Sequence, residues 1–130
     1  MVDAEARPPG RWRWAGRALS GLVALFFLFS AAMKLTRPEG MDEGLAHLGL
    51  PESLILPIAI LEISCVLVYL VPPTAVLGAV LLTGYVGGTI LTHLRVGDPI
   101  YLQVLLGGLV WLGVTLREER LRALLPVRRV

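Results

Sequence analysis

Four long apolar runs in a chain of 130 residues constrain the fold more than any other feature of this sequence. Each run has about 17 to 22 residues, and a helix that rises about 1.5 Å per residue then approaches the roughly 30 Å thickness of a hydrocarbon core. The composition agrees, because 55% of the residues are hydrophobic. In hydrocarbon, every backbone polar group must be bonded within its own segment. We therefore expect four transmembrane helices, at residues 14–35, 54–71, 74–94 and 100–116.

The connections between the runs predict an all-α, antiparallel four-helix transmembrane bundle that forms one domain over residues 1–130. Residues 71–74, with two prolines, form a very tight turn, and residues 95–99 form a second short one. Only the connection at residues 36–53 is long. Runs joined this closely have to lie antiparallel to their neighbours in the chain.

Two segments outside the runs have the pattern of short helices that lie on a membrane surface. The long connection has apolar residues among acids, and Gly49 and Pro51 mark the end of a predicted helix; the apolar residues are Met41, Leu45, Leu48 and Leu50. After the last run, Leu121, Leu124 and Leu125 lie opposite arginines, which predicts a helix on the inner leaflet.

The basic residues are distributed unevenly about the expected bundle. Nine of the twelve lie on the side of the two termini, and the other three are Lys34, Arg37 and Arg95. The positive-inside rule therefore places both termini in the cytoplasm. We expect the first run to stay in the protein rather than to be cleaved as a signal peptide, because it is long enough to span and follows a tail with Asp3 and Glu5.

Glu62 lies inside the second run, where a charged group costs about 2.5 to 3.5 kcal/mol at the centre of a spanning helix. It is about 12 Å below the outer surface when depth is counted at about 1.5 Å per residue. On the third run, Tyr85, Thr89 and His93 are spaced by four residues and share one helical face. The same counting places these residues, Lys34 and Gln103 in the outer half of the bundle and leaves the inner half almost entirely apolar. The sequence thus predicts a polar pocket that opens outward, formed by Lys34, Glu62, Tyr85, Thr89, His93 and Gln103.

Simpler explanations remain open for individual residues of this predicted pocket. Lys34 at a helix end is expected to reach the headgroups, and His93 to donate to a carbonyl. Glu62 is compatible with a hydrogen bond between helices that has only a structural role. Lys34 and Glu62 differ in counted depth by about 10 Å, so they either pair directly or are bridged by water or by the Tyr85 hydroxyl.

Gly84 and Gly88 form a small-x-x-x-small pair, which predicts close packing against another helix, either within the bundle or in a homodimer. Cys65, the single cysteine, is expected to act as a small buried apolar residue. No catalytic, phosphate-binding, haem or metal signature is recognised, and a metal site at His47, Glu62 and His93 is disfavoured. We assign no catalytic residue, and we expect no metal and no nucleic-acid partner.

Several stretches of the sequence resemble the DoxX-like family of bacterial four-helix integral membrane proteins. The resemblance covers almost all of residues 17–128, and its most specific part is "GGTILTHLRVGDP" at 87–99. Further matching stretches are "FFLFSAAMKL", "GLAHLGLPESL", "AILEIS" and the terminal "RLRALLPVR". The resemblance implies the bacterial inner membrane and an association with quinone-linked or periplasmic oxidoreductases. It makes quinone the one cofactor to consider, whereas the lack of paired cysteines speaks against catalytic redox activity of the chain itself.

Three functions follow as hypotheses. The first is an accessory subunit of a redox or quinone-linked membrane system, in which Glu62, His93 and Lys34 form a quinone or proton site. The second is a carrier or binding protein for a small solute. The third is a structural partner of another membrane protein, which would contact the long outer loop and the arginine-rich tail.

Overall fold

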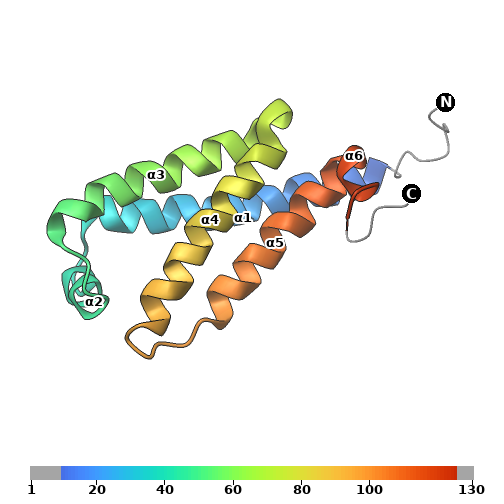
Figure 1. The fold of residues 1–130 in the computed structure, drawn as a ribbon. Coiled ribbons are helices and arrows are strands. Elements are labelled where there is room, and N and C mark those ends of the chain that lie inside the picture. Colours follow the sequence, from blue (N-terminus) through green and yellow to red (C-terminus); the bar gives the residue numbers. More distant parts are fainter. Residues whose placement is uncertain (1–9, 126–130) are drawn as a thin grey trace.

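The computed structural model describes residues 10–125 and consists of helices joined by short connections (Figure 1). The long helices are α1 (Gly10–Thr36), α3 (Glu52–Leu70), α4 (Ala75–Leu94) and α5 (Tyr101–Arg117). The short elements are α2 (Met41–His47), the 3₁₀ turn η2 (Pro72–Thr74) and α6 (Glu119–Arg122). This confirms the predicted all-α bundle, and the boundaries of the four runs agree with the long helices to within a few residues except at the start of α1.

The four long helices form a closed ring in which α1 contacts α3 and α5, and α4 contacts the same two helices. Two ends of this bundle can be distinguished. At the α2 end, α1 and α4 finish while α3 and α5 begin; the α6 end is the opposite one. Figure 1 shows that α4 and α5 cross the α1–α3 pair at an angle and diverge from it toward α2.

Three segments are long and apolar enough to cross a membrane: Gly10–Thr36, Glu52–Leu70 and Pro72–Leu94. The fourth, α5, is a shorter apolar helix of 17 residues. The outward faces of these helices are apolar: Leu25 on α1, Leu67 on α3 and Leu91 on α4 are each more than half exposed. An exposed apolar surface of this extent is expected where lipid replaces water around the protein.

Glycines in the left-handed conformation end both α2 and α4. Gly49 has φ 72°, the Leu50 N–H donates to the Leu45 carbonyl, and the Gly49 N–H donates to the Ala46 carbonyl. This pair of bonds is the Schellman pattern, which favours glycine at the residue with positive φ. Gly97, with φ 80°, closes α4 in the same way. The predicted end of the loop helix near Gly49 is confirmed.

Close helix packing occurs at the α6 end and uses glycines other than the predicted pair. A Cβ added to Gly78 would lie 2.2 Å from the Tyr69 Cα, and one added to Gly16 would lie 2.8 Å from the Arg117 backbone nitrogen. At Gly84 and Gly88 an added Cβ would meet no heavy atom within 4 Å. The described chain therefore places no neighbouring helix against Gly84 or Gly88, and their use in a homodimer stays a prediction.

Candidate functional site

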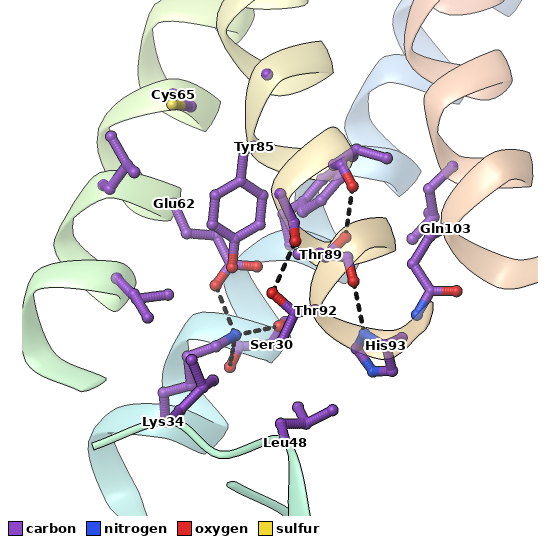
Figure 2. A pocket seen from close by; sticks show the side chains of 18 of the residues that line it. Ser30, Lys34, Leu48, Glu62, Cys65, Tyr85, Thr89, Thr92, His93 and Gln103 are labelled. Atoms are coloured by element: carbon purple, nitrogen blue, oxygen red, sulfur yellow. Dashed lines mark hydrogen bonds and ion pairs between the residues drawn. The ribbon is translucent and has the colours of Figure 1, made fainter. Parts of the chain in front are cut away.

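A cavity of about 640 Å³ lies at the α2 end of the bundle and has walls from all four long helices and from α2. Most of its lining is apolar, including Phe27, Ile58 and Leu106 in the bundle and Met41, Leu45, Leu48 and Leu50 in the α2 segment. The polar residues that line it are Ser30, Lys34, Glu62, Tyr85, Thr89, Thr92, His93 and Gln103. All six residues predicted for the polar pocket thus line one cavity (Figure 2).

Lys34 and Glu62 form a direct ion pair in the wall of this cavity. The Lys34 Nζ donates to the Glu62 Oε2 at 2.9 Å and to the Ser30 Oγ at 2.8 Å (Figure 2). Helical side chains lean toward the N-terminus of their helix, so the Lys34 stem runs along α1 toward the depth of Glu62. Of the arrangements left open by the sequence, the direct pair is the one observed. The Glu62 side chain is 1% exposed and that of Lys34 is 12% exposed, so this pair is almost removed from solvent.

The Tyr85 side chain lies beside this ion pair, with its hydroxyl directed toward the Glu62 carboxylate (Figure 2). Its ring packs edge-on against Phe27, with the ring centroids 6.2 Å apart. Tyr85 therefore joins the apolar wall to the charged part of the cavity.

The threonines and the histidine of α4 form hydrogen bonds to the carbonyls of their own helix. The Thr89 and Thr92 hydroxyls donate to the Val86 and Gly88 carbonyls. The His93 Nδ1 lies 2.8 Å from the Thr89 carbonyl oxygen. A carbonyl can only accept, so Nδ1 carries the hydrogen and Nε2 remains as the ring atom available to a ligand.

Gln103 provides a buried polar atom that lacks a partner. Its Oε1 is buried and accepts no hydrogen bond within residues 10–125. A buried polar atom without a partner costs about 1 to 3 kcal/mol. Since Gln103 lines the cavity, a bound molecule could supply this missing hydrogen bond.

The segment that contains α2 covers the α2 end of the cavity and is attached to the turn between α4 and α5. The His47 Nε2 lies 2.9 Å from the Asp98 Oδ1, and the Arg95 Nη2 donates to the Leu48 carbonyl at 2.6 Å. Arg37 pairs with Glu52 at 2.6 Å near the start of α3, and this hydrogen bond raises the Arg37 pKa. The apolar residues of the α2 segment line the cavity.

No metal site is formed by the described residues. His47 pairs with Asp98, and Glu62 pairs with Lys34. Within residues 10–125, no three His, Cys, Asp or Glu side chains converge closely enough to hold a metal ion.

A second polar layer lies at the α6 end, where the sequence predicted almost pure hydrocarbon; that prediction is wrong. The Ser20 Oγ and the Tyr69 hydroxyl lie 3.1 Å apart, and the Tyr69 hydroxyl donates to the Val110 carbonyl at 2.8 Å. Both Ser20 and Tyr69 are fully buried. Tyr69 lies near the end of its apolar run, where the sequence does not show that its side chain is buried. The only sequence signal for this layer was the tyrosine hydroxyl itself, because a buried hydroxyl requires a hydrogen-bond partner.

The DoxX-like family matches the chain over residues 18–116, which include every residue that lines the cavity. No curated protein and no solved structure gives a significant match. The family match covers far more than half of the chain and agrees with the helical bundle and its apolar outer surface. The chain is a membrane protein of the DoxX-like family.

Proposed function

We propose that the cavity binds a neutral, lipid-soluble molecule with a polar head, and that quinones are the class that fits it best. The observation that carries this proposal is the Lys34–Glu62 ion pair in the wall of a largely apolar cavity. The two charges cancel, so a charged ligand would find no net counter-charge there. A long apolar wall with hydrogen-bonding groups in one region suits a molecule with an apolar tail and a neutral head.

The polar groups of the cavity match both redox forms of a quinone head. Quinone carbonyls need donors, and the Gln103 amide can supply one. Quinol hydroxyls need acceptors, and the His93 Nε2 and the partnerless Gln103 oxygen can serve. Glu62, held by Lys34, is the group that could take up or return a proton when the head changes its redox state.

The α3–α4 side of the cavity supports access from the bilayer. Leu61 on α3 and Leu81, Gly84 and Gly88 on α4 line the cavity and are exposed. Neither glycine has a side chain to close this side. A ligand dissolved in lipid can then enter between α3 and α4 and leave its tail among the acyl chains.

In this proposal the protein is an accessory subunit of a quinone-linked system in the bacterial inner membrane, without catalysis of its own. The arginine distribution supports cytoplasmic termini, which would direct the α2 end toward the periplasm. A partner oxidoreductase would exchange the quinone with this cavity.

The direct test measures binding of decylubiquinone, a quinone with a short tail, to the purified full-length protein in detergent. Thermal melting should show a dose-dependent rise in Tm, because a ligand that binds only the folded state stabilises it. Glu62→Gln should weaken the affinity by about tenfold, or about 1.4 kcal/mol, because it leaves the Lys34 charge without its counter-charge beside a neutral head. Ser64→Ala is the matched control, since Ser64 lies on the same helix, is exposed and donates to its own helix.

Two results would overturn this proposal. One is the absence of a quinone-induced Tm shift in the unaltered protein. The other is equal affinity in the correctly folded Glu62→Gln and Ser64→Ala variants. A small polar solute that raises Tm where the quinone does not would instead favour the solute-carrier function.

A further inference from the structure

A second cavity, of about 330 Å³, lies at the α6 end, at the opposite end of the bundle from the first. Its charged lining residues are Arg17 of α1, Arg117 of α5 and Glu118, and its walls include Pro72 and Ala75, where η2 leads into α4. This cavity plays no part in the proposed quinone site.

Arg117 is held rigidly in this cavity but is not fully bonded. Its guanidinium carbon lies 4.6 Å from the centroid of the Tyr69 ring, and its Nη2 donates to the Tyr69 carbonyl. Its Nε–H is buried and has no acceptor within residues 10–125. A guanidinium fixed on an aromatic ring, with an unused donor, is preorganised to bind an additional acceptor.

The cavity also carries an excess of positive charge. Arg17 and Arg117 form no ion pair with any residue from 10 to 125, and only one carboxylate, Glu118, lines the cavity with them. Nearby basic residues are already bonded, because Arg13 pairs with Glu119 and Arg122 donates to the last carbonyls of α5.

The depth of this cavity in the membrane is indicated by two exposed tryptophans. Trp12 and Trp14 are 46% and 71% exposed and precede Arg17 on α1. Tryptophan is enriched at the level of the lipid headgroups. Arg17 lies about 4.5 Å further along the helix axis than Trp14, at about 1.5 Å per residue. A phosphate at headgroup depth is therefore within reach of the cavity.

We propose that this cavity binds a phosphate group, with Arg117 and Arg17 as its two cationic ligands. Arginine presents a planar set of donors that matches phosphate oxygens. The phosphate can belong to an anionic phospholipid headgroup or to free inorganic phosphate, and these two sources require separate measurements.

The test compares the Tm of the detergent-purified full-length protein with added phosphatidylglycerol, phosphatidylcholine or inorganic phosphate. We expect phosphatidylglycerol to raise Tm more than phosphatidylcholine at equal concentration. Arg17→Gln should reduce the apparent affinity for phosphatidylglycerol by about tenfold, as the loss of one charged contact implies. Arg120→Gln removes the same charge from an exposed position on α6 outside the cavity and should leave the affinity unchanged.

Arg117→Lys provides a second variant that retains the charge but loses the planar donors. It should also weaken the phosphatidylglycerol effect in protein whose circular dichroism is unchanged. A Tm rise with inorganic phosphate that Arg17→Gln abolishes would assign the site to the free anion. The proposal is overturned if Arg17→Gln and Arg120→Gln have equal effects, or if neither phosphatidylglycerol nor inorganic phosphate raises Tm above the phosphatidylcholine value.

Discussion

Lys34 and Glu62 form an ion pair in the apolar wall of the first cavity. Removal of two ions from water is costly, and their attraction offsets this cost only when the geometry is good and further hydrogen bonds are made. Ser30 supplies one such bond, because its Oγ accepts from the Lys34 Nζ. A buried pair of this kind is a weak source of stability, which favours a role in ligand or proton binding over a structural one.

The first prediction concerns this ion pair. Lys34→Met leaves a 1% exposed carboxylate without its cation and should destabilise the protein by about 3 to 5 kcal/mol. Glu62→Gln should cost less, because the amide oxygen still accepts from Lys34. The double variant with Lys34→Met and Glu62→Leu should recover most of the lost stability, since an apolar pair removes both desolvation costs. Denaturant unfolding in mild detergent measures all three variants.

This prediction has a clear contrary outcome. If the Lys34→Met variant is as stable as the unaltered protein, the ion pair with Glu62 does not contribute to the free energy of unfolding. Lys34 would then only reach toward the membrane surface. Ser64→Ala again serves as the control for a polar change on α3 outside the ion pair.

At the scale of single elements, α4 has glycines with two different environments. Gly78 lies against the backbone of Tyr69 on α3, so the two helices approach each other closely at the α6 end. Gly84 and Gly88 lie further along α4 toward the α2 end and line the open cavity. The same residue type thus brings helices together at one end of α4 and leaves space for a ligand at the other.

The second prediction uses this contrast. Gly78→Ala should strongly destabilise the protein, because a Cβ 2.2 Å from the Tyr69 Cα forces α3 and α4 apart. Gly84→Ala meets open space and should stabilise α4 by about 0.5 to 1 kcal/mol through helix propensity. The Tm of the two variants, measured in parallel, checks both expectations. A marked loss of stability in Gly84→Ala would reveal a partner helix at this position, as in a homodimer.

The third prediction concerns α2, which covers the first cavity. Asp98→Asn weakens the contact with His47 and should increase hydrogen exchange of the backbone amides in residues 41–50. Glu43→Gln is the control, because Glu43 is an exposed acid of α2 outside the described ion pairs. Equal exchange in the two variants would mean that the His47–Asp98 contact does not hold α2 in place.

The whole molecule has two different ends. At the α6 end, glycines and the buried Ser20–Tyr69 pair bring the helices together beside the smaller cavity, while the helices diverge around the larger cavity at the α2 end. The first cavity is neutral and the second is basic, so the two ends are suited to different ligands.

The fourth prediction concerns the orientation of the whole molecule in the membrane. In a Cys65→Ser background without other cysteines, Glu43→Cys and Arg120→Cys each introduce one exposed thiol. A membrane-impermeant maleimide should label position 43 in intact cells and position 120 only after the membrane is permeabilised. The opposite pattern would place the termini outside the cytoplasm.

The sequence by itself determined the helices, their membrane environment and the end of the bundle at which most of the cavity's polar residues lie. Long apolar runs, proline turns and terminating glycines act within one segment, so their effects can be read along the chain. The stripe of Tyr85, Thr89 and His93 was predictable for the same reason, because helical spacing fixes which residues share a face.

Only the tertiary structure decided which faces meet. Helix tilt and rotation depend on packing between segments, and no periodicity within one run specifies them. The direct Lys34–Glu62 bond, the Ser20–Tyr69 pair and the different environments of Gly78 and Gly84 all follow from those rotations. The same packing leaves Gly84 facing a cavity and directs Arg117 inward over Tyr69, because side-chain partners across the bundle are fixed only once the four helices assemble.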